Sequence, residues 1–181
     1  KLKSILNRLV EKGKINQEKS QLIISNIKWT TEMKDISPSN LVFEAIVENM
    51  EIKQKLFSQM EQIVSDDCIL ATNTSSLSVT GIASICSNKS RVMGIHFFNP
   101  VPLMKLVEVI PTDETDKKLL SEVKSILENW EKSVVTAKDT PGFIVNRVAR
   151  PFYSEALKIY EEGIADFATI DWAMTEIGGF R

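Results

Sequence analysis

Apolar residues recur along this 181-residue chain with two spacings, one typical of helices and one typical of strands. At the start, Leu2, Ile5, Leu6 and Leu9 follow the spacing of a helix with one buried face, and Gly13 stands where such a helix would end. Short apolar runs further on predict strands at residues 27–31, 41–47, 68–73, 91–98, 105–110 and 133–137. Helical spacing between them predicts helices that begin after a cap at Asn49, at about residue 78 and at residue 116.

Strands and helices alternate up to Lys138, which favours an α/β fold with a parallel sheet and helical crossovers. Beyond this residue the pattern becomes entirely helical. Residues 139–142, Asp-Thr-Pro-Gly, offer a cap and a proline suited to a first helical turn, and Pro151 is expected to kink the helix that follows. We therefore expect two domains, residues 1–138 and 139–181.

Composition and charge narrow the functional classes. Apolar residues make up 43% of the chain and charged residues 25%, which is typical of globular proteins. A net charge of -2 gives no field for tracking phosphates, so nucleic acid and anionic membranes are poor partners. Cys68 and Cys86 have neither CxxC spacing nor a histidine partner, so no metal site or disulfide framework is expected, and a reducing compartment fits best. The first residues do not resemble a signal peptide.

His96 is the only histidine of the chain and the first candidate for chemistry. It lies at the carboxyl end of a predicted parallel strand, where ligands gather in open α/β sheets. Its imidazole titrates near neutrality, so it can take a proton from an alcohol and return it. The alternative is a core histidine packed beside Phe97 and Phe98.

Glu108 is the second candidate because it interrupts an apolar strand, where alternation places it on one face with Leu106 and Ile110. An unpaired carboxylate in that position would be costly, so it needs a cation or a hydrogen-bond donor. One such partner is His96, held in one tautomer and stabilised in its charged form by the carboxylate. Lys105 or another base is the alternative.

Further polar residues cluster where predicted strands turn into helices. Residues 73–76, Asn-Thr-Ser-Ser, would face the same crevice as His96, although a serine at such a place is more often a helix cap than a ligand. Asn146 is either a polar residue of the site or a partner for backbone groups at the domain junction. Glu48 and Lys53 are normally interpreted as a solvated ion pair of little energetic value.

The dinucleotide fingerprint GxGxxG is absent from these residues. The seven glycines stand at 13, 81, 94, 142, 163, 178 and 179, and no two of them have the required spacing. Either no dinucleotide is bound, or its pyrophosphate loop lies outside this sequence. A nucleophilic serine is disfavoured as well, since there is no GxSxG motif.

Four groups of residues resemble the L-3-hydroxyacyl-CoA dehydrogenase family, in its short-chain or 3-hydroxybutyryl-CoA form. They are VFEAIVEN at 42–49, ATNTSSL at 71–77, GIHFFNPV at 94–101 with MKLVEVI at 104–110, and KDTPGFIVNR at 138–147. They occur in the order and with the spacing of that family. The resemblance covers nearly all of the chain from residue 27 onward.

The resemblance implies an oxidoreductase that interconverts an L-3-hydroxyacyl-CoA and its 3-oxoacyl-CoA with NAD, in fatty-acid metabolism. It implies that His96 is the general base for the 3-hydroxyl group and that Glu108 orients it. Ser75 and Asn146 would hydrogen-bond the reacting oxygen or the surroundings of the histidine. The implied cofactor-binding residues are Glu48, Lys53, Asn73 and Asn99, the first three along the nicotinamide and its ribose.

The same resemblance implies a Rossmann-type sheet that lacks its first strands and its glycine-rich loop, followed by the start of an all-helical domain. The chain is therefore expected to be truncated at both ends. The expected partners are an acyl-CoA substrate and a second copy of the complete protein, in the cytoplasm. The competing hypothesis is a non-catalytic binding or structural relic of the same scaffold.

Overall fold

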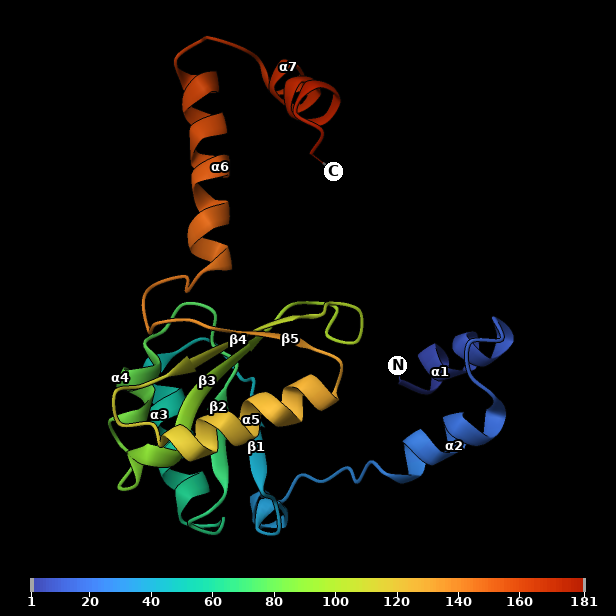
Figure 1. The fold of residues 1–181 in the computed structure, drawn as a ribbon, viewed down its shortest axis with the longest axis vertical. Helices are drawn as coiled ribbons and strands as arrows, with labels where there is room; N and C mark the ends of the chain where they lie inside the picture. Colours follow the sequence, from blue (N-terminus) through green and yellow to red (C-terminus); the bar gives the residue numbers. More distant parts are fainter. Residues whose placement is uncertain (1, 181) are drawn as a thin grey trace. The chain divides into compact units, whose positions relative to one another are not determined.

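A computed structural model describes residues 2–180 of the chain (Figure 1). The chain forms two compact units, residues 1–35 and residues 36–181. The second unit contains every candidate site residue named above.

The first unit contains two helices. α1 (Leu2–Glu11) ends as its sequence predicts, because Gly13 adopts a left-handed φ of 64° and its amide bonds back to the carbonyl of Val10 at 2.9 Å. The sequence pattern does not predict α2 (Gln17–Ser25), because its apolar residues form a continuous run, 22–24, without helical spacing.

The strand predicted at residues 27–31 is wrong. The segment is irregular and leads into a 3-10 turn, η1 (Met33–Ile36), and Trp29 is 77% exposed. A strand needs a neighbour for its backbone hydrogen bonds. Within the described part of the chain, the sheet offers this segment no pairing, so its apolar residues alone do not make it a strand.

Five strands of the second unit form one sheet in the order β1-β2-β3-β4-β5 (Figure 1). They are β1 (Leu41–Glu44), β2 (Ile69–Thr72), β3 (Val92–Phe97), β4 (Leu106–Pro111) and β5 (Ser133–Thr136). All five lie where the apolar runs predict them, and the α/β class is confirmed.

One pairing of the sheet differs from the prediction of a parallel sheet. β3 and β4 pair antiparallel, whereas the other neighbouring strands pair parallel. The connection between them, residues 98–105, contains no helix. A parallel crossover needs about a dozen residues or more, so this short connection can only turn the chain back on itself.

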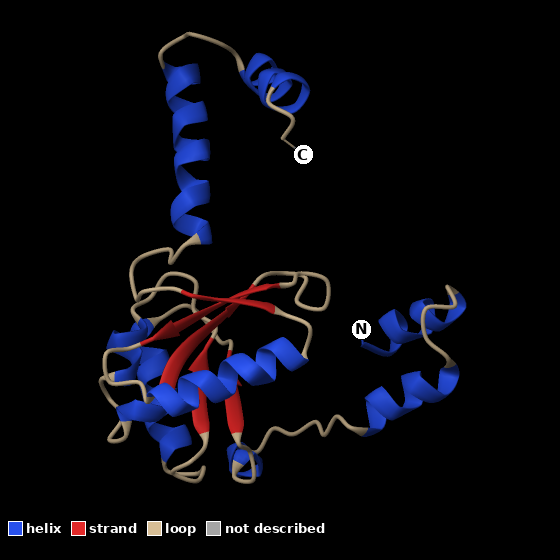
Figure 2. Ribbon diagram, viewed as in Figure 1, coloured by secondary structure: helices blue, strands red, loops and turns tan. Residues whose placement is uncertain are grey.

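Helices cover both faces of the sheet (Figure 2). α3 (Met50–Glu61), which is capped by Asn49 as predicted, and α4 (Val79–Ala83) pack on one face, and α5 (Lys117–Asn129) packs on the other. The core on the first face includes Phe57, Met60, Leu70, Ile82 and Val92, and the core on the second includes Ala71, Val107, Val109, Val123 and Leu127. The two cores fix β2, β3 and β4, whose carboxyl or amino ends carry the candidate site.

The helix expected at residue 139 begins later than predicted. Gly142 and Phe143 both have left-handed φ values, 77° and 47°, so α6 (Val145–Glu161) begins only after them. Asp139 does not cap this helix. It accepts hydrogen bonds from the amides of Val79 at 2.9 Å and Thr80 at 2.8 Å, at the start of α4.

The C-terminal helices expose much apolar surface. α6 passes through Pro151 without ending, and it is followed by α7 (Phe167–Trp172) and a π-helical turn, η3 (Ala173–Ile177). Phe152 on α6 is 50% exposed. Within residues 2–180, no helix is both long enough and apolar enough to cross a membrane.

Candidate active site

His96 and Glu108 lie opposite each other on two adjacent strands. They form a directly paired position of the antiparallel β3–β4 ladder, and His96 Nδ1 is 2.7 Å from Glu108 Oε2. Both side chains are buried. A carboxylate only accepts hydrogen bonds, so Nδ1 carries the proton of this contact. The lone pair of the neutral ring is therefore on Nε2.

The second carboxylate oxygen of Glu108 accepts hydrogen bonds from the backbone at the start of α6. Oε1 accepts hydrogen bonds from the amides of Ile144 at 2.9 Å and Val145 at 3.0 Å, at the start of α6. Free amides and the helix dipole favour a negative charge at this end of a helix. The carboxylate therefore has three donors, and it joins the imidazole to the first turn of α6.

The Nε2 side of His96 faces a serine. Ser75 Oγ lies 3.2 Å from Nε2, and Ser75 is exposed. Two aromatic rings pack edge-on against the imidazole, Phe98 with a centroid distance of 4.7 Å and Phe143 with 5.6 Å. The ring is thus held by apolar walls and by Glu108, while its lone pair points to the exposed serine.

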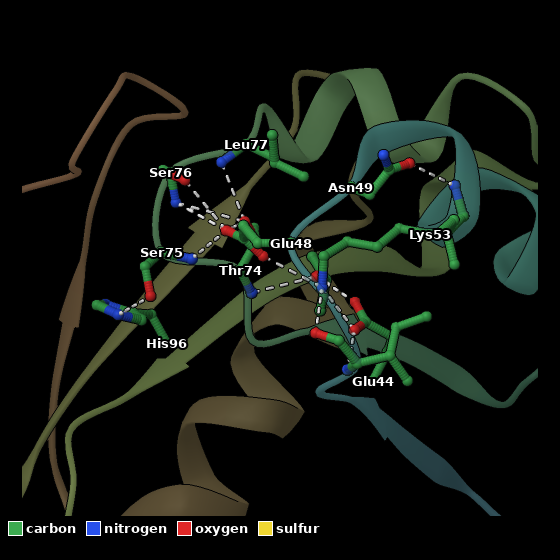
Figure 3. Close-up of polar contacts among 12 residues, drawn as sticks. Glu44, Glu48, Asn49, Lys53, Thr74, Ser75, Ser76, Leu77 and His96 are labelled. Atoms are coloured by element: carbon green, nitrogen blue, oxygen red, sulfur yellow. Dashed lines mark hydrogen bonds and ion pairs between the residues drawn. The ribbon is translucent and has the colours of Figure 1, made fainter.

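Ser75 belongs to a turn that a carboxylate holds in place (Figure 3). Glu48 Oε1 accepts hydrogen bonds from the Thr74 hydroxyl and from the amides of Ser75 at 3.0 Å and Ser76 at 3.2 Å. Burial acts to raise the pKa of Glu48, but the hydrogen bonds from Thr74 and Ser75 and the charge of Lys53 outweigh it and lower the pKa to about 2.

Lys53 and Glu48 are not a solvated ion pair. The Lys53 side chain is only 1% exposed, and its Nζ lies 2.6 Å from Oε1 of the buried Glu44 and 3.3 Å from Oε2 of Glu48. Glu44 was not among the predicted residues. Its signal in the sequence is an acidic residue that interrupts an apolar run, residues 41–47, the same signal that singled out Glu108.

The three predicted asparagines occupy different environments. Asn73 accepts a hydrogen bond from the Phe97 amide at 2.9 Å, which joins the ends of β2 and β3. Asn99 is exposed and precedes a cis peptide bond to Pro100. Asn146 is half-buried in the first turn of α6. In the part of the chain that the structure describes, no side-chain hydrogen bond brings Asn99 or Asn146 to His96.

The arrangement suits proton transfer at Nε2 of His96. One ring nitrogen is locked by a carboxylate, and the other lies within hydrogen-bond distance of the hydroxyl group of an exposed serine. Such a pair takes a proton from an oxygen and returns it. The structure contains the expected contact of His96 with Glu108, and it places Ser75, one of the predicted site residues, within hydrogen-bond distance of His96.

Two residues near the site were not predicted from the sequence as parts of it. Phe143 packs on the imidazole from a left-handed backbone, and Asp139 ties the same segment to α4. Local sequence places both in a helix start, because Asp-Thr-Pro-Gly has the composition of one. Only the positive φ of two successive residues shows otherwise.

Comparison with known proteins assigns the chain to a family. Residues 1–140 match the family described as 3-hydroxyacyl-CoA dehydrogenase, NAD binding domain, and residues 142–181 match the family described as 3-hydroxyacyl-CoA dehydrogenase, C-terminal domain. The first match alone covers most of the chain.

Curated relatives are similar over almost the whole chain. The 3-hydroxyadipyl-CoA dehydrogenase of Escherichia coli is 41% identical over 175 residues, which are 97% of this chain and 37% of that protein. The 3-hydroxybutyryl-CoA dehydrogenase of Clostridioides difficile is 43% identical over 169 residues, 93% of this chain and 60% of that protein. The mitochondrial hydroxyacyl-coenzyme A dehydrogenase of Sus scrofa is 41% identical over 174 residues, 96% of this chain and 55% of that protein.

Solved structures have the same fold. The crystal structure of 3-hydroxybutyryl-CoA dehydrogenase from Escherichia coli superposes with a TM-score of 0.93 and 40% identity, covering 96% of this chain and 37% of that chain. The (S)-3-hydroxybutyryl-CoA dehydrogenase of Ralstonia eutropha gives a TM-score of 0.95 and 36% identity, covering 98% of this chain and 62% of that chain.

The chain thus spans between 37% and 60% of the length of these curated relatives. Its mostly parallel sheet with helices on both faces is Rossmann-like, and it leads into the start of a helical C-terminal domain. Both the sequence motifs and the fold agree, and the chain belongs to the 3-hydroxyacyl-CoA dehydrogenase family.

Proposed function

We propose that the protein is an NAD-dependent dehydrogenase that interconverts an L-3-hydroxyacyl-CoA, such as 3-hydroxybutyryl-CoA, and the corresponding 3-oxoacyl-CoA in fatty-acid metabolism. One observation carries this proposal: His96 has Nδ1 bound by a buried carboxylate and Nε2 turned to an exposed serine. The names of the relatives support the substrate class, because they include 3-hydroxybutyryl-CoA and hydroxyacyl-CoA dehydrogenases.

In the oxidative direction, Nε2 of His96 removes the proton of the 3-hydroxyl group. Removing that proton while the hydride leaves C3 avoids a high-energy oxocarbenium ion, and a positioned base contributes about 10² to 10⁴ in rate. Glu108 stabilises the imidazolium that forms, because its charge is opposite and only 2.7 Å away. In the reverse direction the imidazolium gives its Nε2 proton to the forming alkoxide.

Ser75 and Asn146 are the proposed binding groups for the reacting oxygen. The Ser75 hydroxyl lies within hydrogen-bond distance of Nε2 of His96. A substrate oxygen that binds to Nε2 would therefore lie beside the Ser75 hydroxyl as well. Asn146 follows Val145, whose amide holds Glu108, in the first turn of α6, and this position in the chain supports its proposed role.

NAD is the proposed cofactor, and the match to an NAD binding domain supports it. The exposed Glu48 carboxylate and the Asn99 amide follow the ends of β1 and β3, and they suit the carboxamide and ribose of a nicotinamide nucleotide. The remaining predicted contacts bond within the protein, Lys53 with Glu48 and Asn73 with the Phe97 amide. The bound cofactor would accept a hydride from C3 or return it.

The proposal includes two domains, a homodimer and a cytoplasmic location. A cofactor domain at 1–138 and a helical domain at 139–181 are supported by the two family matches. Dimerisation through the helical domain is supported by the apolar side chains exposed on α6. The reducing cytoplasm is supported by two buried free cysteines, Cys68 and Cys86. Sedimentation of the complete gene product and cell fractionation test the last two points.

The activity is tested with the complete gene product by following NADH consumption with acetoacetyl-CoA. We expect turnover in the wild type and a loss of about 10² to 10⁴ in kcat for His96→Ala, since the general base is removed. A folded wild type without turnover on 3-oxoacyl-CoA substrates would overturn the proposal and favour a binding or structural role.

Two neighbouring serines provide a matched pair of variants. Ser75→Ala removes the hydroxyl beside Nε2, whereas Ser76→Ala removes a hydroxyl that bonds to Glu48 at 3.2 Å. We expect the first variant to lose much more of kcat than the second. Equal losses would contradict the placement of Ser75 at the reacting oxygen.

A further inference from the structure

We infer that Glu44, Lys53 and Glu48 form a positioning relay that sets the Ser75 hydroxyl against His96, in addition to any contact that Glu48 or Lys53 makes with a cofactor. The relay is defined by these three side chains (Figure 3). Its effect on the position of Ser75 follows from the geometry alone, and its effect on rate rests on the proposed function.

The first step is the turn that carries Ser75. Residues 74–76 belong to neither a strand nor a helix, so the ladders of the sheet do not hold them. A single oxygen, Glu48 Oε1, gathers the Thr74 hydroxyl and the amides of Ser75 and Ser76. Because one of these amides belongs to Ser75 itself, the carboxylate fixes the origin of the side chain that reaches Nε2.

The second step is the cation that orients Glu48. Lys53 Nζ lies between Glu48 Oε2 at 3.3 Å and Glu44 Oε1 at 2.6 Å, and it also donates to the Ile46 carbonyl at 3.4 Å. All three donors of the ammonium are therefore used inside the protein. Turning Lys53 toward a ligand would leave the buried Glu44 without its cation, which is strongly unfavourable.

The third step is a second route from Glu44 to the same turn. Glu44 Oε2 accepts a hydrogen bond from the Thr72 hydroxyl at 2.7 Å, and that hydroxyl oxygen accepts one from the Thr74 amide at 3.2 Å. The start of the turn is thus anchored through Thr72 while its middle is anchored through Glu48. Two independent routes from one buried carboxylate converge on the residues around Ser75.

The charges explain why the relay acts as a unit. Two carboxylates share one ammonium, so the amides and hydroxyls of the turn supply the remaining stabilisation for Glu48. If Glu44 were neutral, Lys53 would be attracted to Glu48 alone and would compete with those amides. Glu44 has no hydrogen bond with His96 or Ser75 among the described residues, yet a change at Glu44 is expected to alter the position of Ser75 against the His96 ring.

The test uses the single histidine of the chain, whose ring signals need no assignment. We compare the ¹H–¹³C spectrum of His96 in the 181-residue wild type with Glu48→Gln, Glu44→Gln and Ser75→Ala. Glu51→Gln is the matched control, because Glu51 lies exposed in the first turn of the same helix, α3. We expect the ring signal of both relay variants to move from the wild-type position toward that of Ser75→Ala, and that of the control to stay.

A ring signal that stays at the wild-type position in Glu44→Gln and Glu48→Gln, while Ser75→Ala moves it, would overturn the inference. A Ser75→Ala signal that does not move would overturn it as well. If a buried charge change unfolds the chain, Thr72→Val interrupts only the second route and keeps all charges, and it must then move the ring signal in the same direction.

Kinetics of the complete gene product separate positioning from cofactor contact. For Glu44→Gln we expect a fall in kcat of up to about 10²-fold, with the affinity for NADH unchanged, because a displaced group near the reacting atoms slows the chemical step. Weaker NADH binding with an unchanged kcat would overturn the positioning role. The spectra do not depend on dehydrogenase activity, so a failure of the proposed function and a failure of the relay give different results.

Discussion

The replacement Glu108→Gln tests the central contact of the site most sharply, because it keeps the shape of the side chain and changes its charge and its hydrogen-bonding. The carboxylate accepts three hydrogen bonds, at 2.7 Å from His96 and at 2.9 and 3.0 Å from two amides of α6. A glutamine has one accepting oxygen, which can keep the two amides. Its NH₂ group then faces Nδ1 of His96.

Facing an NH₂ donor, Nδ1 must become an acceptor, and the proton of the neutral ring moves to Nε2. We expect Nε2 to lose its function as a base, with a loss of about 10² to 10⁴ in kcat for the complete gene product. The stability also falls. Charge-assisted hydrogen bonds contribute about 1 kcal/mol more than neutral ones, so three of them set an upper limit of about 3 kcal/mol. Relief of carboxylate burial lowers the expected cost below this limit, to about 1–2 kcal/mol.

Two measurements on the 181-residue chain check these values. Long-range ¹H–¹⁵N spectra of the single histidine show which ring nitrogen carries the proton, and urea unfolding gives the change in free energy. Glu122→Gln, an exposed position on α5, is the control and is expected to change neither. A glutamine variant with wild-type stability and with the proton still on Nδ1 would refute the reasoning.

Three further predictions concern the scaffold. Gly94→Ala is expected to lower the unfolding free energy by about 1–3 kcal/mol, because the new Cβ would lie 2.8 Å from Val79 Cγ2 and 3.0 Å from Ile110 Cβ; an unchanged urea midpoint would contradict this close packing. Burial acts to raise the pKa of Asp139, but hydrogen bonds from the start of α4 outweigh it and hold the pKa below its ordinary value of 3.8. The contribution of Asp139 to the stability of the folded chain is therefore present above pH 3.8, and it is lost as the pH falls through the lower pKa of the folded state. Asp139→Asn should therefore cost about 1 kcal/mol at neutral pH and flatten the loss of stability in acid, and parallel acid profiles for variant and wild type would argue against this capping role. Burial raises the pKa of Cys86 from 9.0 to about 11, which lowers the fraction of thiolate at neutral pH about 10²-fold. Thiol reagents should therefore react much faster with the chain unfolded in urea than with the folded chain. Equal rates would be inconsistent with a buried thiol.

The sequence predicts the strands of the second unit well because each is a short apolar run bounded by polar turns. Alternation within β4 places Glu108 on the face opposite Val107 and Val109, and the structure confirms that these valines pack under α5. The meeting of Glu108 with His96 follows from this alternation together with the family motifs. The antiparallel β3–β4 pairing was predictable as well, from the length of the connection between the two strands.

Other features depend on information that local patterns do not contain. The run at residues 27–31 resembles a strand, but pairing requires a neighbour that its composition cannot specify. Asp139 has the sequence of a cap and does act as one, but for a helix that begins 60 residues earlier in the chain. The burial of Lys53 depends on Glu44, nine residues away, because only the folded chain brings a helix and a strand end together.

The donors that α6 offers to Glu108 are main-chain amides, at residues 144 and 145. Any amino acid except proline supplies such a donor, so these two positions can drift in evolution without loosening the carboxylate. The contact of Glu108 with α6 therefore depends on the direction of the backbone at the start of this helix and not on particular side chains. A helical domain taken from another member of the family should complete the proton-transfer pair, provided that it enters at the same angle and places no proline at these positions.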